Sequence, residues 1–198
     1  LTFTQNIAMG IKQTFGGNFL SVTWSLAIEE QFYLVAPLAI MALGRPLFVK
    51  ILMPLAFFAL ILRIMLPGFQ CYVNTLFRMD SLLFGVFLGF LYSCPRSWSI
   101  IQKYPKRILA LLFFMGFLIV CYAIIGTLGA FKFTIYGIFF TLFICTAILY
   151  QSSKYTFLLR LPILCFFGYI SYGLYLWHMI FLGFFHDIFN QGMGPILL

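Results

Sequence analysis

An apolar stretch near the start of the sequence carries polar side chains at helical spacing. Ser25, Glu29 and Tyr33 recur every fourth residue and so form one stripe on an α-helix. Glu30 is turned away from this stripe by about 100°. A carboxylate in apolar surroundings can hold an arginine or take a proton from a hydroxyl. We therefore expect Glu29 to face a polar cavity, whereas Glu30 either reaches the membrane interface or pairs with an arginine for stability.

A second polar stripe lies near the end of the sequence. Ser171, Tyr175 and His178 occupy positions i, i+4 and i+7 of another apolar stretch. Histidine titrates near neutral pH, which suits proton transfer. A single histidine in an apolar helix is also often a hydrogen-bonded packing residue, and both interpretations stay open at this point.

Arg78 and Asp80 are the charged residues of a third apolar stretch. They are two positions apart, and residues at that spacing do not face one another on a helix. Each is expected to pair with a different helix, and we consider the pairs Arg78 with Glu29 and Asp80 with Arg63. The alternative is a buried lattice of ion pairs without chemistry.

The composition makes these polar residues exceptional. The 198 residues are 64% hydrophobic and 8% charged, whereas a soluble domain is about half apolar and about a quarter charged. Because backbone groups in lipid must be satisfied within helices, we expect an all-α, polytopic transmembrane bundle.

The net charge of +8 comes from scattered Lys and Arg without a basic run, so we expect no nucleic-acid partner. The five cysteines lack CxxC spacing, and we expect no metal site.

About six stretches are apolar enough to span a bilayer, which takes roughly 20 residues. They are about Thr23–Leu43, Val49–Leu66, Leu76–Ser93, Arg107–Gly126, Phe133–Tyr150 and Ile163–Phe185. We expect residues 1–198 to form a single membrane-embedded domain, with residues 1–20 as an external loop segment.

Loop charge predicts the orientation of these spans. The loops after the first, third and fifth spans hold eight of the twelve Lys and Arg residues, so we place them in the cytoplasm. On this orientation six ionisable residues fall toward the outer face: Glu29, Glu30, Arg63, Arg78, Asp80 and His178. Ionisable residues inside a membrane commonly mark a functional site.

Three motifs give a more specific indication. The sequence "WSLAIEEQFYLVAPL" (24–38) resembles the WSL-x-x-E-x-x-FYL-x-x-PL signature of the acyltransferase 3 family of integral-membrane O-acyltransferases. The segment "FRMDSLLFGVFLGFL" (77–91) is similar to the R-x-D-x-L-x-x-G segment of that family. The segment "FGYISYGLYLWH" (167–178) is similar to its G-x-I-SY-x-LYL-x-H stretch.

The resemblance implies a membrane-bound O-acyltransferase of the cytoplasmic (inner) membrane. Such an enzyme moves an acyl group, often acetyl, from acyl-CoA to a hydroxyl of a sugar in a surface polysaccharide or glycoside. Its expected partners are acyl-CoA, a carbohydrate or glycolipid acceptor and the lipid bilayer, with acyl-CoA as a donor substrate and no bound cofactor.

The residues above then take expected roles. Glu29, with His178, would orient or activate the acceptor hydroxyl. Arg78 would hold a carboxylate or stabilise charge on the acyl oxygen, and Trp24 would stack on a sugar or anchor the helix at the interface. The full set of candidate substrate-binding residues is Trp24, Ser25, Tyr33, Arg78, Asp80, Ser171 and Tyr175.

The sequence also departs from the family pattern. Family members are expected to have about ten helices, a histidine in the first and an Arg-x-x-Arg motif after the second, and the histidines here are His178 and His186. The resemblance therefore implies a fragment without the N-terminal helices and without the last helix. Two other functions stay open, a transporter or flippase for a glycolipid and an inactive truncated remnant.

Overall fold

The computed structural model describes residues 3–15, 23–126, 129–153 and 156–192, and helices joined by short connections are the regular structure of these residues. In chain order the elements are α1 (Gln5–Lys12), α2 (Thr23–Leu43), α3 (Arg45–Met65), α4 (Gln70–Val73), α5 (Thr75–Ser93), α6 (Pro95–Gln102), α7 (Pro105–Ile125), η1 (Gly129–Phe131), α8 (Lys132–Leu149), η3 (Leu158–Arg160) and α9 (Pro162–Gly192). The expected all-α class is confirmed.

Five helical segments of the described chain are long and apolar enough to cross a membrane. They are Thr23–Leu43, Arg45–Met65, Gln70–Ser93, Pro105–Ile125 and Gly129–Leu149, and they coincide with the first five expected spans. The protein is therefore a polytopic helical membrane protein. The sixth expected span, Ile163–Phe185, falls within α9 and stays a prediction.

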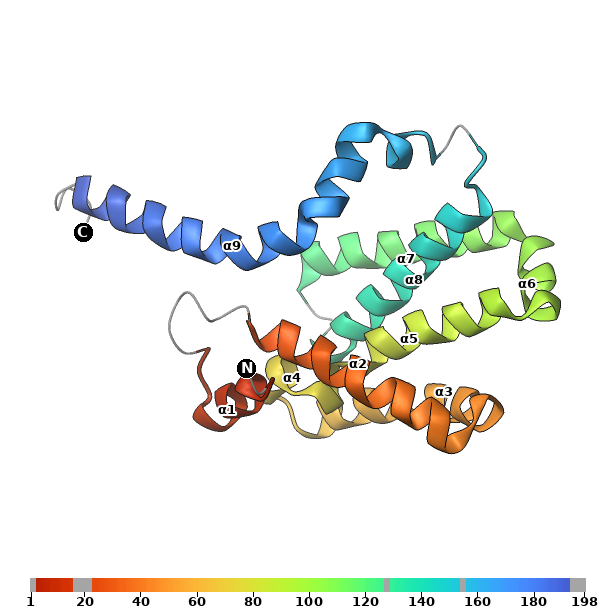
Figure 1. Cartoon of the computed structure of the whole chain (residues 1–198), viewed down its shortest axis with the longest axis horizontal. Coiled ribbons are helices and arrows are strands. Elements are labelled where there is room, and N and C mark those ends of the chain that lie inside the picture. Colours follow the sequence, from red (N-terminus) through yellow and green to blue (C-terminus); the bar gives the residue numbers. More distant parts are fainter. Residues whose placement is uncertain (1–2, 16–22, 127–128, 154–155, 193–198) are drawn as a thin grey trace.

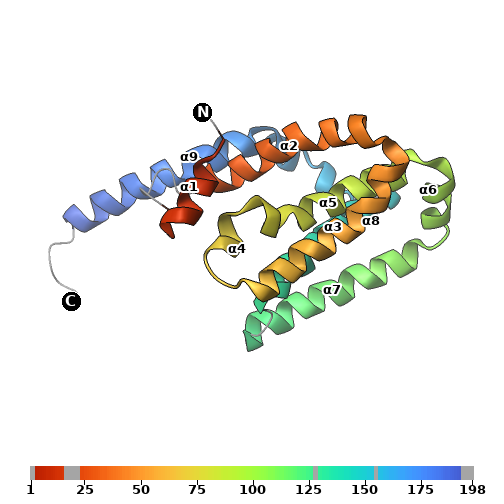
Figure 2. The ribbon, with the colours of Figure 1, turned by 90° about the horizontal axis from the view of Figure 1, so that it is seen from below.

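The helices run back and forth between two ends of the bundle (Figures 1 and 2). One end, here called the α6 end, holds the α2–α3 connection and α6, and the start of α3 is tied there to the end of α5 because Arg45 Nη2 donates to Ser93 Oγ at 2.6 Å. The opposite end, here called the α4 end, holds α1, α4 and η1. The starts of α2, α5 and α8 therefore lie toward the same end of the molecule.

The centre of the bundle is the packing of α5 against α3 and α8. Its buried apolar cluster comes from α3 and α5 and consists of Phe48, Leu52, Ala56, Ala59, Met79 and Leu83. On the α8 side, Gly137 permits a close approach, since a Cβ atom there would lie 2.9 Å from Ser81 Oγ and 3.0 Å from Ser81 Cα. By contrast, α7 has no buried residue, which fits a helix whose apolar surface faces lipid.

The segment expected as an external loop contains a packed helix, and its position outside the membrane stays a prediction. In α1, Asn6, Met9 and Gly10 are buried and follow the i, i+3, i+4 spacing of one helical face. Asn6 Nδ2 donates to the carbonyl oxygen of Val73 and to Thr75 Oγ1, at 3.1 Å each. These bonds attach α1 to the start of α5 at the α4 end.

Candidate functional site

The two polar stripes recognised in the sequence meet in the structure. Ser25 Oγ of α2 and the Tyr175 hydroxyl of α9 share a hydrogen bond, although 150 positions separate them in the chain. Both residues belong to the motif segments, and their contact brings the start of α2 against α9. Four residues further along α2, Glu29 is exposed on the same stripe.

Glu29 and His178 extend in opposite directions from this contact. The C-terminal part of α9 runs opposite to α2 (Figures 1 and 2), so Glu29 follows Ser25 toward one side and His178 follows Tyr175 toward the other. His178 Nδ1 donates to the Tyr175 carbonyl of its own helix. Within the described ranges no hydrogen bond or ion pair joins Glu29 to His178, so joint action of the two would require a bridging ligand.

Arg78 lies between two aromatic rings instead of beside Glu29. Its Cζ is 3.8 Å from the centroid of the Phe133 ring and 5.5 Å from that of Trp24. The expected Arg78–Glu29 pair is not formed in the described chain. The reason is helical rotation, because Trp24 and Glu29 are five positions apart and point about 140° away from each other at about 100° per residue.

The expected pair of Asp80 with Arg63 is confirmed. Arg63 Nη1 and Nη2 reach the two Asp80 carboxylate oxygens at 3.0 and 2.6 Å, and both side chains are fully buried. Thr134 Oγ1 also donates to Asp80 Oδ2 at 2.6 Å. Asp80 was a candidate substrate contact from sequence, but in this structure its buried carboxylate accepts three hydrogen bonds from protein groups and joins α3, α5 and α8.

The remaining candidates belong to the same two helices, α2 and α9. Tyr33 is 60% exposed on the Glu29 stripe. Ser171 is exposed, and its hydroxyl donates to the Gly168 carbonyl within α9 at 2.8 Å. Trp24 is partly buried, with its ring centroid 6.5 Å from that of Phe15. The structure therefore divides the predicted site residues between two faces of α2, one toward α9 and one toward Arg78.

A half-buried polar network between α1, α2 and α5 was missed from sequence. Gln31 Nε2 donates to Asn6 Oδ1 at 3.0 Å, and Thr75 Oγ1 donates to Gln31 Oε1. Gln31 therefore fixes the rotation of α2 relative to α1 and α5. The available signal was a glutamine within an apolar span, directly after the two glutamates.

Lys132 and Phe133 at the start of α8 were also missed as site residues. Phe133 contacts Arg78, and Lys132 Nζ donates to the Tyr72 hydroxyl at 2.7 Å. From sequence, Lys132 contributes only to the loop charge, since no spacing rule links it to residues some 50 positions earlier.

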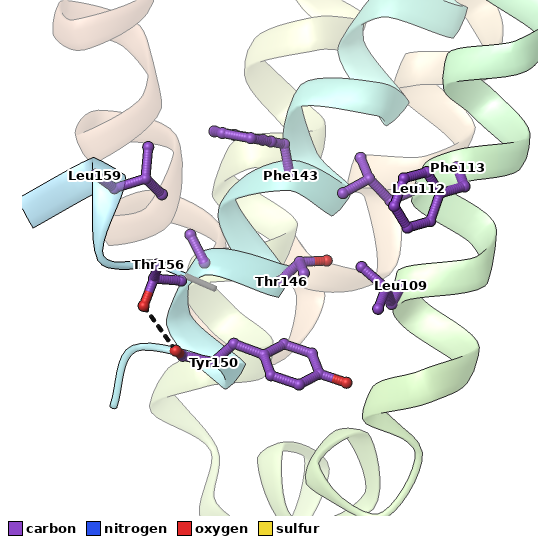
Figure 3. Close-up of a pocket in the computed structure, with 9 residues that line it drawn as sticks. Leu109, Leu112, Phe113, Phe143, Thr146, Tyr150, Thr156 and Leu159 are labelled. Carbon is purple, nitrogen blue, oxygen red and sulfur yellow. Dashed lines mark hydrogen bonds between the residues drawn. The ribbon is translucent and has the colours of Figure 1, made fainter. Parts of the chain in front are cut away.

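An apolar cavity of ≈ 420 Å³ lies toward the α6 end, away from these polar groups. Figure 3 shows its lining from α7, α8 and the segment before α9, including Leu109, Leu112, Phe113, Phe143 and Leu159. The Thr156 hydroxyl is satisfied within the protein, because it donates to the Tyr150 carbonyl oxygen at 2.8 Å. Among the described residues its lining carries no charge, and the cavity is a separate feature from the polar site.

Comparison with known proteins gives one consistent result. The acyltransferase 3 family profile, described as "Acyltransferase domain", matches residues 3–198. The O-acetyltransferase OatA of Staphylococcus aureus is similar to the chain in strains NCTC 8325 and COL, with 31% identity over 190 residues in each. The match covers 87% of this chain and 31% of OatA, so the chain spans less than a third of the length of these curated relatives. No solved structure matches the chain.

Proposed function

This chain belongs to the acyltransferase 3 family, and on that premise we propose that it serves a membrane-bound O-acyltransferase. The reaction moves an acyl group from acyl-CoA to a hydroxyl of a sugar in a surface polysaccharide or glycoside, at the cytoplasmic membrane. The similarity to proteins named O-acetyltransferase supports acetyl as the group transferred. The observation that carries the proposal is the Ser25–Tyr175 contact, which joins two of the family motifs at one exposed site.

Glu29 is the residue best placed to activate the acceptor. Its carboxylate accepts the proton of the sugar hydroxyl, and the hydroxyl oxygen attacks the acyl carbonyl carbon. The bond between the acyl group and its leaving group then breaks, and the proton passes to the leaving group, which is the CoA thiolate if the thioester reacts directly. Ser25 and Tyr175, one turn away, border the position of the hydroxyl.

Arg78 and Trp24 lie on the other face of α2 and take part in binding. A tryptophan face stacks well on a sugar ring, and an arginine beside it can hold a charged or polar substituent. Since about 140° of helix rotation separates this face from Glu29, Arg78 acts on a part of the acceptor distant from the reacting hydroxyl.

Replacing Glu29 tests the proposal directly. In the full-length protein with its own acceptor, Glu29→Gln should reduce the transfer of labelled acetyl from acetyl-CoA by about 100-fold or more, the usual range for loss of a general base. Glu30→Gln is the matched control, because it removes the neighbouring carboxylate, and it should keep the rate within a few-fold. Unchanged transfer by Glu29→Gln at equal protein level would remove Glu29 from the mechanism.

The same assay separates acyl transfer from a transporter or flippase. An acyltransferase consumes acetyl-CoA and releases free CoA in step with acceptor modification. A transporter would move its glycolipid and leave the thioester intact. Running the assay on this chain alone, beside the full-length protein, tests the inactive-remnant alternative.

A further inference from the structure

Three cationic side chains surround one aromatic ring at the α4 end. Arg78 Cζ, Lys132 Nζ and Arg63 Cζ lie 3.8, 4.8 and 5.9 Å from the centroid of Phe133. In the described part of the chain, the cluster contains one carboxylate, Asp80, and it is paired with Arg63. Two positive charges, those of Arg78 and Lys132, therefore remain without a negative partner in the described chain, an arrangement that favours the binding of an anion.

Arg78 has a vacant donor within this cluster. Its Nη1 atom is buried and makes no hydrogen bond in the described structure. A buried donor on a charged group loses the bonds that water would give, so a site that leaves it unpaired is stabilised when a ligand supplies an acceptor. The strongest acceptors for a guanidinium are carboxylate and phosphate oxygens.

Lys132 provides the second charge at the edge of a hollow. It is partly exposed, and it lines a hollow of ≈ 280 Å³ together with Tyr72 and Phe133. Its Nζ lies 4.7 Å from the centroid of the Tyr72 ring. Arg78 Cζ and Lys132 Nζ lie 3.8 and 4.8 Å from the centroid of the same Phe133 ring, so the two charges are close to each other.

We propose that the acceptor is an oligosaccharide with an anionic group, a carboxylate or a phosphodiester, which binds to Arg78 and Lys132 around Phe133. The faces of Trp24 and Tyr72 would contact its sugar rings. This inference rests on the proposed function and specifies its substrate class. Since Glu29 lies on another face of α2, the acylated hydroxyl belongs to a different sugar unit from the anion.

Binding to purified full-length protein in detergent tests this inference without requiring turnover. Three probes are compared by equilibrium dialysis: a uronate-containing tetrasaccharide, the same tetrasaccharide with its carboxylates reduced to alcohols, and a glycerol phosphate oligomer of similar length. We expect an anionic probe to bind at least about tenfold more tightly than the reduced one, as for loss of a charge-assisted hydrogen bond. Preference for the uronate or for the glycerol phosphate identifies the carboxylate or phosphate source.

Two variants and one control locate the effect. Arg78→Gln and Lys132→Gln should each weaken binding of the preferred anionic probe by about tenfold and leave the reduced probe unchanged. Lys12→Gln removes an exposed cation of α1 at the same end and should have no effect. Equal binding of charged and reduced probes, absence of binding, or an equal loss in Lys12→Gln would each overturn the inference.

Acyl-transfer measurements keep the two proposals apart. Selective anion binding that depends on Arg78 and Lys132, without transfer to any acceptor, would contradict the enzymatic function and leave the binding inference standing. Transfer at equal rates to charged and neutral acceptors would contradict the binding inference and leave the enzymatic function standing.

Discussion

At the level of single residues, the charges inside the membrane-spanning helices fall into two groups. Arg63 and Asp80 are fully buried and neutralise one another within a hydrogen-bonded cluster. Glu29 is exposed and Arg78 keeps a donor without a partner, and neither forms an ion pair in the described chain. The first group holds helices together, and the second has no ion-pair partner within the described chain.

Removing one partner of the buried pair should destabilise the protein strongly. Asp80→Ala leaves the Arg63 guanidinium buried without its counter-charge, a change that typically costs about 3–5 kcal/mol. Thermal unfolding in detergent, followed by circular dichroism, measures the loss. The double variant Arg63→Leu/Asp80→Leu removes both charges and should recover much of it. A melting temperature of Asp80→Ala equal to that of the parent would contradict this account.

The sequence was sufficient to predict the Arg63–Asp80 pair but not the partner of Arg78. Arg63 ends one apolar span and Asp80 lies near the start of the next, so two adjacent antiparallel helices bring them together. For Arg78 the deciding partner is Phe133, more than 50 positions away, and spacing within α5 contains no information about it. The rotation of α2, fixed by Gln31, then turns Glu29 away.

At the level of elements, small residues determine how closely the helices approach. The five apolar spans were predictable from length and hydropathy, because these are properties of each helix alone. The packing of α1 was not, since its buried face is short and depends on Asn6 reaching acceptors near the start of α5. The contact of α8 with α5 likewise depends on a glycine whose importance appears only when the facing residue, Ser81, is known.

Adding one methyl group at this contact should loosen it. In Gly137→Ala the new Cβ would lie 3.0 Å from the backbone Cα of Ser81, so α5 and α8 must move apart at a cost of about 1–3 kcal/mol. Gly85→Ala is the matched control, since no atom outside its own helix backbone lies within 4 Å of the added Cβ. A lower melting temperature for Gly137→Ala, with Gly85→Ala unchanged or higher, is the expected result.

At the level of the whole molecule, the basic connections gather at the α6 end. Arg45 is the first residue of α3, and Arg96 and Lys103 belong to the α5–α7 connection, which lies at the same end of the bundle in both views. The predicted orientation places this end in the cytoplasm. The polar groups of α2, α5 and α9 then open toward the external face.

Cys94, between α5 and α6, reports this orientation. With Cys94 as the only cysteine, intact cells should show labelling by a membrane-permeant maleimide and none by a charged, impermeant one. A Lys12→Cys variant of the cysteine-free protein should be labelled by both reagents, since α1 lies at the other end. Labelling of Cys94 by both reagents, and of the Lys12→Cys variant by the permeant reagent alone, would indicate the opposite orientation.

The rate of that labelling should also depend on Ser97. Hydrogen bonds from the Ser97 side chain and backbone lower the pKa of the Cys94 thiol, so more of it is thiolate at neutral pH. Ser97→Ala should raise this pKa and slow maleimide addition at pH 7, with little effect at a pH well above both values. Equal rates at pH 7 would argue against the Ser97 bonds.

The ion pair between α3 and α5 bears on how the chain is made. Arg63 and Asp80 are 17 positions apart, so α3 emerges from the ribosome with its charge while Asp80 is still inside the exit tunnel. Either charge alone opposes partition into lipid, by about 2.5–3.5 kcal/mol at the centre of a helix. The two charges neutralise one another only in the hairpin of both helices, so the translocon is expected to release α3 into the bilayer only together with α5.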